Sequence, residues 1–179
     1  MSNEKKQPPE SGSVPSKPFV ISRLFRAPKD LLFRVWTDPE HLKHWWGPKD
    51  VRVTVKKLEM KPGGIYHYSM ILPDGSSSWG KMIYREIIEN EKLVFLNMFS
   101  DEDGNITRHP LAATWPLQML STITFKEQDE GTLVTIEWQP YEAGETEQAT
   151  FDDSHESMNQ GWSGSFEVLE RYLAGLQAS

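Results

Sequence analysis

Residues 36–48 read WTDPEHLKHWWGP and contain the signals that start and stop a short helix. Asp38 is a favoured N-cap residue, because its carboxylate accepts a hydrogen bond from a backbone N–H group of the first turn. Pro39 suits the first helical position, where a missing N–H costs nothing. Gly47-Pro48 predicts the end of the helix. We therefore expect a helix at residues 39–46.

The sequence on either side of this helix divides into further elements. Residues 19–26 alternate loosely, as a strand does, and residues 28–37 repeat apolar side chains at helical spacing. Residues 146–176 repeat apolar side chains every three or four positions, which predicts a single long helix. Between these helices, turn residues separate segments that we interpret as strands at 51–60, 65–72, 79–88, 93–99, 119–126 and 132–139, with an irregular stretch at 106–117.

This order of elements predicts an α+β protein, because its strands follow one another while its helices are kept apart from them. We expect the helix-grip arrangement, in which a curved antiparallel sheet of about six or seven strands wraps around the long C-terminal helix. The domain should span residues 19–179. Residues 1–18 combine prolines and charges with almost no apolar side chains, so we expect them to form a disordered tail.

The composition narrows the partners that the chain can have. The net charge is −7, and residues 1–18 contribute +1 from three lysines and two glutamates, so −8 belongs to the rest. A field of that sign repels phosphate backbones, and nucleic-acid binding is not expected. No run approaches the roughly 20 apolar residues of a membrane helix, and no apolar signal segment opens the chain. The absence of cysteine excludes disulfides and fits a cytoplasmic protein.

Two segments resemble the bracketing helices of one family. They are residues 36–48 and residues 158–173, which read MNQGWSGSFEVLERYL. The family comprises single-domain proteins similar to the activator of the heat-shock protein 90 ATPase, within the START-like (SRPBCC) superfamily. Stretches that resemble it internally are KPGGIYHYSM at 61–70, PDG at 73–75 with Trp79-Gly80, and TRHPLAATWPLQMLSTITF at 107–125. The resemblance implies a helix-grip fold with a hollow; relatives include chaperone activators, lipid carriers and aromatic cyclases.

Aromatic and methionine side chains supply most of the candidate ligand-binding residues. The chain has seven Trp, seven Met and eight Phe residues, which serve equally well as ordinary core. The resemblance favours a pocket for the set as a whole. His109 is the candidate polar group at its mouth, unless it ties down the loop backbone by hydrogen bonds. The full set is Trp45, Trp46, Tyr66, Tyr68, Met70, Trp79, Met82, Met98, His109, Trp115, Met119, Trp138, Met158 and Trp162.

Other polar residues are interpreted structurally. His41 and His44 lie three residues apart, as metal ligands on one helix face can. Further ligands are missing, however, so we interpret them as a solvated face and predict no metal site. His155 lies on the apolar stripe of the last helix and is interpreted as a hydrogen-bonded core residue. Gly161 and Gly164 interrupt the same helix at a cost of about 1 kcal/mol each relative to alanine, which suggests either close approach of the helix to the sheet or space for a ligand.

We therefore expect a protein that binds a small hydrophobic or aromatic molecule between its sheet and its last helix, without a cofactor. No nucleophile–base pair is readable, so no catalytic residue is assigned. One alternative is a chaperone-associated stress-response module, which would need an exposed contact surface. Another is a cyclase- or hydrolase-like enzyme that uses the same cavity. A third is a hollow filled by the chain itself, which a volume below roughly 300 Å³ would indicate.

Overall fold

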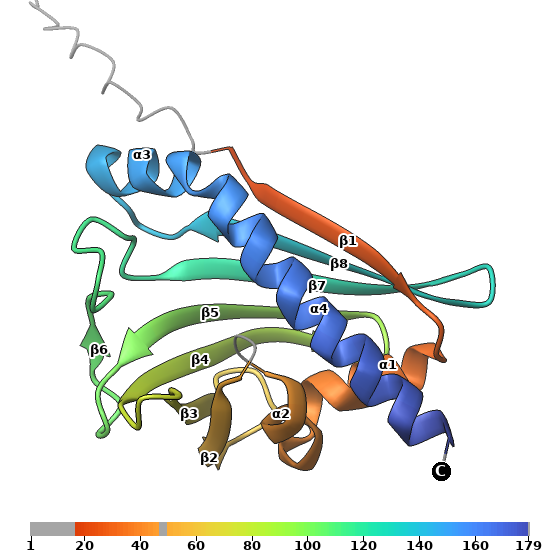
Figure 1. Ribbon diagram of the computed structural model, residues 1–179. Coiled ribbons are helices and arrows are strands. Elements are labelled where there is room, and N and C mark those ends of the chain that lie inside the picture. Colours follow the sequence, from red (N-terminus) through yellow and green to blue (C-terminus); the bar gives the residue numbers. More distant parts are fainter. Residues whose placement is uncertain (1–16, 47–49, 179) are drawn as a thin grey trace, which may run out of the picture.

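The computed structural model describes residues 17–46 and 50–178 (Figure 1). Its elements, in chain order, are β1 (Phe19–Phe25), α1 (Lys29–Thr37), α2 (Pro39–Trp45), β2 (Arg52–Leu58), β3 (Ile65–Ile71), β4 (Ser77–Ile88), β5 (Lys92–Ser100), β6 (Ile106–Thr107), β7 (Met119–Gln128), β8 (Gly131–Pro140), α3 (Glu145–Asp153) and α4 (His155–Ala178). The predicted strands are confirmed, with the two-residue β6 added inside the irregular stretch. The predicted tail lies almost entirely outside the described residues.

The strands form one antiparallel sheet, in the order β1-β8-β7-β5-β4-β3-β2, with β6 paired to β5. Figure 1 shows α4 crossing one face of this sheet diagonally, with α1 and α2 beside the C-terminal half of α4. The predicted α+β helix-grip fold is confirmed. Among the described residues, no helix is both long enough and apolar enough to cross a membrane.

Local signals position the two short helices as expected. The Asp38 carboxylate accepts a hydrogen bond of 2.9 Å from the Glu40 backbone N–H, and Pro39 occupies the first position of α2. This cap satisfies one of the N–H groups that a helix start leaves unpaired. The predicted stop at Gly47-Pro48 lies outside the described residues. Helix α2 ends at Trp45, which leaves Trp46 in extended backbone.

The core lies between the sheet and the helices that cover it. Alternation along β8 turns Val134 and Ile136 inward, and both are fully buried. Phe166 on α4 packs edge-on against Phe25, and Trp162 stacks on Trp36 at 6.0 Å. Each large apolar side chain buried in this way contributes about 1.5–3 kcal/mol. The contacts fix α4 against both β1 and α1.

The single long helix predicted at residues 146–176 is wrong in one respect, because it is broken at Ser154. That residue has φ −101° and ψ 6°, and its hydroxyl donates to the Thr150 carbonyl at 2.7 Å. Such a bond back to the preceding turn bends a helix. Figure 1 shows α3 turned away from the axis of α4. Helix α3 thereby reaches the segment at 106–118.

Three side-chain contacts join that segment to α3. Arg108 forms an ion pair of 2.6 Å with Glu147, and the hydroxyls of Thr114 and Thr150 hydrogen-bond at 2.9 Å. Trp115 also packs near Phe151, with ring centroids 6.0 Å apart. Helix α3, which is the part of the predicted helix before the break at Ser154, therefore holds the irregular segment over one end of the sheet.

Candidate functional site

A cavity of about 290 Å³ lies between the sheet and α4 and opens to solvent. Its walls come from strands of the sheet, from the segment at 106–118 and from α4. The lining residues are Trp46, Tyr68, Met70, Gly80, Asn97, Met98, Phe99, His109, Trp115, Pro116, Met119, Trp138, Met158, Gly161, Trp162 and Ser165. Most of this surface is aromatic or methionine side chain, as in many pockets for small molecules.

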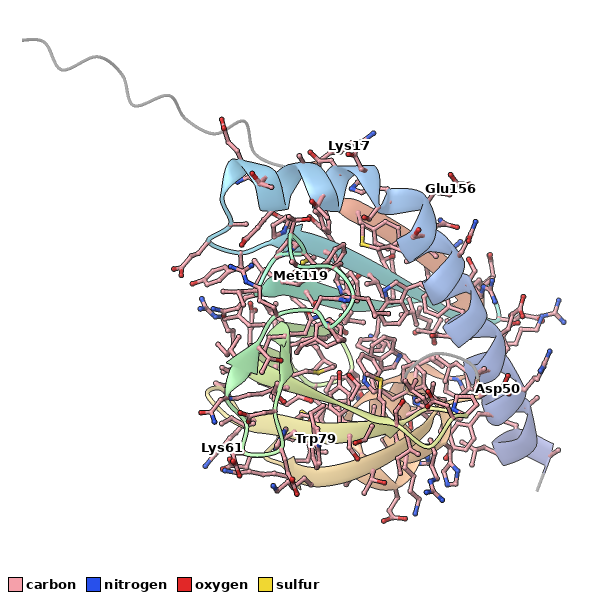
Figure 2. The ribbon with its side chains drawn as sticks, turned by 60° about the vertical axis from the view of Figure 1, so that its left-hand side comes forward. Lys17, Asp50, Lys61, Trp79, Met119 and Glu156 are labelled. Atoms are coloured by element: carbon pink, nitrogen blue, oxygen red, sulfur yellow. The ribbon has the colours of Figure 1, made fainter. Side chains whose placement is uncertain are left out.

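Most of the predicted site residues meet at this cavity. They are Trp46, Tyr68, Met70, Met98, His109, Trp115, Met119, Trp138, Met158 and Trp162. Figure 2 labels Met119 in this region, and it labels Trp79, which lies on a separate part of the sheet. The predicted residues Trp45, Tyr66, Trp79 and Met82 do not line the cavity.

Helix and strand geometry explains why these residues lie elsewhere. Trp45 is buried against Trp36, with ring centroids 4.7 Å apart, and its indole N–H donates to the Val35 carbonyl at 2.8 Å. Trp79 belongs to the opposite sheet face, because its neighbour Gly80 lines the cavity. There Lys56 lies over the Trp79 ring, 5.3 Å from its centroid.

Tyr66 and Met82 share the inner sheet face but lie deeper. Both line a second, much smaller void of about 10 Å³, to which Trp46 and Trp36 also contribute. The Tyr66 hydroxyl and the Trp36 indole nitrogen are buried without a hydrogen-bond partner among the described residues. Burial strongly raises the pKa of the Tyr66 hydroxyl. Trp46 lines both voids and therefore separates the cavity from the smaller void within the core.

An aromatic wall closes the α4 side of the cavity. Trp162 meets Trp138 edge-on at 5.5 Å and Trp46 at 5.9 Å. Because Trp162 also stacks on Trp36, its ring is fixed from several sides. Aromatic pairs in such geometries contribute about 0.5–1.5 kcal/mol beyond their buried area. The wall is rigid, so the shape of the cavity is largely formed in advance.

His109 lies at the loop end of the cavity. Its Nδ1 accepts a hydrogen bond of 3.0 Å from the Leu111 backbone N–H, and its ring packs against Phe99 at 4.7 Å. Burial lowers the pKa of the His109 imidazole. Both effects favour the neutral ring. The loop-tying alternative for His109 is therefore observed, and the same residue also lines the cavity.

Tyr68 and Gly80 form part of the cavity floor. A Cβ atom at position 80 would lie 2.4 Å from both the Tyr68 hydroxyl oxygen and its Cζ atom, so the phenol ring occupies the space over the glycine. Burial raises the pKa of the Tyr68 hydroxyl, and a hydrogen bond from Trp46 partly opposes that shift. The phenol is therefore neutral at physiological pH.

Several lining residues were missed by the sequence analysis: Gly80, Asn97, Phe99, Pro116, Gly161 and Ser165. Asn97 and Phe99 share the parity of the buried Phe95 on β5, which could have placed them on the inner sheet face, whereas Met98 between them has the opposite parity. The Asn97 side-chain oxygen accepts a hydrogen bond of 2.5 Å from the buried Ser121 hydroxyl. Among the described lining residues there is no carboxylate, lysine or arginine.

The other histidines serve in packing. His41 Nδ1 lies 2.6 Å from the Tyr172 hydroxyl, and the His44 ring stacks on Tyr172 at 5.3 Å. The described part of the chain contains no group of three or more His, Cys, Asp or Glu residues placed to hold a metal. His155 packs against Phe19 and Phe151, but its Nε2 has no hydrogen-bond partner among the described residues. The hydrogen-bonded interpretation of His155 is thus wrong for that atom.

Comparisons with known proteins agree with this architecture. A crystal structure from Mycobacterium smegmatis is 28% identical with a TM-score of 0.69, covering 87% of this chain and 90% of that one. A solution structure from Arthrobacter aurescens is 26% identical with a TM-score of 0.73, covering 88% and 86%. A solution structure from Staphylococcus epidermidis, at 23% identity and a TM-score of 0.70 over 89% and 91%, shares the fold.

No curated protein matches the sequence. The model of one protein family does match, over residues 26–174, and its description is "Activator of Hsp90 ATPase homolog 1-like protein". The match covers both bracketing helices and every residue that lines the cavity. The chain therefore belongs to the Activator of Hsp90 ATPase homolog 1-like family.

Proposed function

We propose that this protein binds a compact, largely apolar molecule in the cavity between the sheet and α4. The observation that carries the proposal is the cavity itself, which has about 290 Å³ of space and an aromatic lining. That volume equals the share of roughly ten water molecules in the liquid. It suits a ligand of one or two rings. Burial of such rings on tryptophan and methionine surface supplies the binding energy.

The expected affinity is modest because the ligand is small. At about −0.5 kcal/mol per non-hydrogen atom, a ligand of about ten atoms binds with a Kd of order 0.1–1 mM. A natural ligand that reaches further toward the opening would bind more tightly. The measured binding free energy is what remains of the interaction energy after the entropic cost of ordering the ligand has been subtracted. The method used to detect binding has to tolerate weak complexes.

The chemistry of the lining favours binding over catalysis. The Nδ1 lone pair of His109 is engaged by the Leu111 N–H, and the described lining residues include no carboxylate that would pair with the ring. A general base needs a free lone pair within hydrogen-bond reach of the proton that it abstracts, and among the described lining residues neither a carboxylate nor the engaged Nδ1 of His109 supplies one. A reaction in this cavity would have to rely on positioning and on hydrogen-bond donation.

The exposed apolar side chains do not favour the chaperone-associated alternative. Among the described residues, the large ones are Val20, Leu24, Leu72, Ile88, Ile106 and Leu111. They belong to β1, to the turn between β3 and β4, to the end of β4 and to the segment at 106–118. A co-chaperone contact would call for one continuous apolar patch. The volume of about 290 Å³ falls just below the roughly 300 Å³ that would indicate a self-filled hollow, so volume alone does not separate the two alternatives; the opening of the cavity to solvent favours a ligand.

Proton–nitrogen NMR titration tests the proposal. Tetralin, a hydrocarbon of two fused rings, is added to labelled protein while the indole N–H signals are followed. We expect saturable shifts for the lining residues Trp46, Trp115, Trp138 and Trp162, and none for Trp79 on the opposite sheet face. If Trp79 shifts as strongly as the lining residues, or if no indole signal shifts at all, the proposal is wrong.

A further inference from the structure

Three polar side chains of the cavity share a property that restricts what the ligand can be. Asn97, Tyr68 and His109 reach the cavity from β5, from β3 and from the segment at 106–118. Asn97 and His109 each have an acceptor atom engaged by a protein donor, and Tyr68 lies beside the Trp46 indole, whose N–H can only donate. Each side chain therefore offers an N–H or O–H group to the cavity.

Asn97 is the clearest case. Its side-chain oxygen accepts a hydrogen bond from the Ser121 hydroxyl. The Asn97 oxygen therefore faces Ser121, which is fully buried. The amide nitrogen points away from Ser121 and carries two donor hydrogens. No described residue accepts a hydrogen bond from it.

Tyr68 and His109 follow the same logic. The Trp46 ring lies edge-on to Tyr68, with ring centroids 6.3 Å apart, and its indole N–H can only donate, so this neighbour leaves the Tyr68 proton available. His109 accepts at Nδ1 from the Leu111 N–H, so the proton of the neutral ring is on Nε2. His109 Nε2 has no hydrogen-bond partner among the described residues. Both side chains are therefore donors toward the cavity.

The three donors lie around one residue, Phe99. In the β4–β5 register Phe99 is opposite Gly80, and the Tyr68 phenol lies over Gly80. Asn97 precedes Phe99 by two residues and so shares its sheet face. The His109 ring packs on Phe99 with centroids 4.7 Å apart. The opposite wall is formed by Trp138, Met158, Trp162 and Ser165, and it is mostly apolar or aromatic.

We infer that the ligand carries a neutral oxygen that only accepts hydrogen bonds, such as the carbonyl of a compact cyclic ketone, placed at the Phe99 end of the cavity. The inference rests on the proposed function and adds the chemical class of the ligand. A cationic ligand would lose its hydration without gaining a carboxylate from the described lining residues, and an anionic ligand would gain no lysine or arginine. An accepting oxygen satisfies donors that would otherwise be left unpaired on binding.

A matched set of ligands tests the inference. It consists of 1-tetralone, with one carbonyl; tetralin, the hydrocarbon; and 5,6,7,8-tetrahydro-1-naphthylamine, which offers donors in place of the carbonyl. NMR titration gives each Kd. A hydrogen bond worth about 0.5–1.5 kcal/mol changes Kd by about 2- to 10-fold. We expect 1-tetralone to bind at least several-fold more tightly than tetralin, and the amine no more tightly than tetralin.

Variants then locate the effect. Three variants each replace a donor with an apolar side chain: Asn97→Leu, Tyr68→Phe and His109→Phe. Each should lower the ratio of the affinity for 1-tetralone to the affinity for tetralin. Trp79→Phe, on the other sheet face, is the control and should leave the ratio unchanged. Loss of the buried Ser121 partner makes Asn97→Leu the most disruptive variant, and the other two keep the test valid if it fails to fold.

The outcomes separate the inference from the function on which it rests. If tetralin and 1-tetralone bind equally, and the three variants leave their ratio unchanged, the inference is wrong and the binding function stands. If the amine binds best, the donor assignment is reversed and the inference is also wrong. If none of the three ligands shifts the lining indole signals, both the inference and the proposed function are overturned.

Discussion

The Tyr68 phenol ring lies directly over Gly80, in space that a Cβ atom at position 80 would need. Such an atom would lie 2.4 Å from the Tyr68 hydroxyl oxygen, which is well inside van der Waals contact. Glycine in a strand interior usually weakens the strand, and it often marks a close approach of this kind. The glycine at position 80 therefore lets a tyrosine from β3 form the floor of the cavity.

The first prediction concerns that contact. Gly80→Ala should lower the free energy of unfolding by about 1–3 kcal/mol, because the buried Tyr68 ring has to move. In a Tyr68→Leu background, the same change should cost much less, since the overlapping atoms are gone. Chemical denaturation of the four proteins in this cycle measures the coupling. Equal costs in both backgrounds would mean that Tyr68 does not hold this position.

The second prediction uses the two glycines of α4. A Cβ atom at Gly161 or at Gly164 would meet nothing within 4 Å, so alanine should stabilise the helix by about 1 kcal/mol at either position. Only Gly161 lines the cavity. Gly161→Ala should therefore weaken tetralin binding, while Gly164→Ala should stabilise the protein without affecting Kd. Thermal unfolding and NMR titration measure the two effects, and a weaker Kd in both variants would contradict the assignment of the wall.

The third prediction concerns a buried hydroxyl. Tyr66 is fully buried, and its hydroxyl has no partner among the described residues. Tyr66→Phe should leave the free energy of unfolding unchanged or raise it by about 1 kcal/mol. Tyr68→Phe is the matched control on the same strand, where the Trp46 indole partly opposes the rise in pKa that burial causes, and it should destabilise by about 1 kcal/mol. Urea unfolding compares them, and a larger loss for Tyr66→Phe would reveal an unseen partner.

The fourth prediction is a pH dependence. Burial lowers the pKa of His109 in the folded protein below the value of about 6.5 expected for the unfolded chain. As the pH falls below 6.5, the unfolded chain binds a proton that the folded ring resists. The stability contributed by His109 is therefore complete above that pH and is lost as the pH falls through it.

Unfolding of the wild type and of His109→Phe between pH 8 and pH 5 isolates this effect from the other histidines. The difference between the two proteins should be constant above about pH 7 and should shift in favour of the variant toward pH 5. A difference that does not change with pH would show that the His109 ring titrates alike in both states.

The sequence predicted the fold well because the relevant signals are local. The Asp38-Pro39 pair determines the start of α2 without help from the rest of the chain. The break at Ser154 was not predictable, because no glycine or proline marks it and the apolar repeat continues across it. The break coincides with contacts made far away in sequence, where α3 meets Arg108 and Thr114.

The residues of the candidate site were predicted less completely than the fold. Trp45 and Trp46 are neighbours, but α2 ends at Trp45 and Trp46 has extended backbone. The Trp45 side chain therefore lies in the core, whereas Trp46 lines the cavity. Trp79 could have been excluded, since it differs in parity from Met82 on the same strand. Asn97 could not have been assigned as a donor, because that depends on Ser121, which is 24 positions away in the sequence.

Proton–nitrogen NMR titration of matched variants with tetralin tests the central claim most directly, because it detects weak complexes. Wild type, Gly161→Leu and Gly164→Leu are compared, since a Cβ atom at either glycine would meet nothing within 4 Å and only Gly161 lines the cavity. We predict saturable shifts of the lining indole signals in the wild type and in Gly164→Leu, and their loss in Gly161→Leu. Shifts that persist unchanged in Gly161→Leu, or the absence of shifts in all three proteins, would contradict the claim that this cavity binds a ligand.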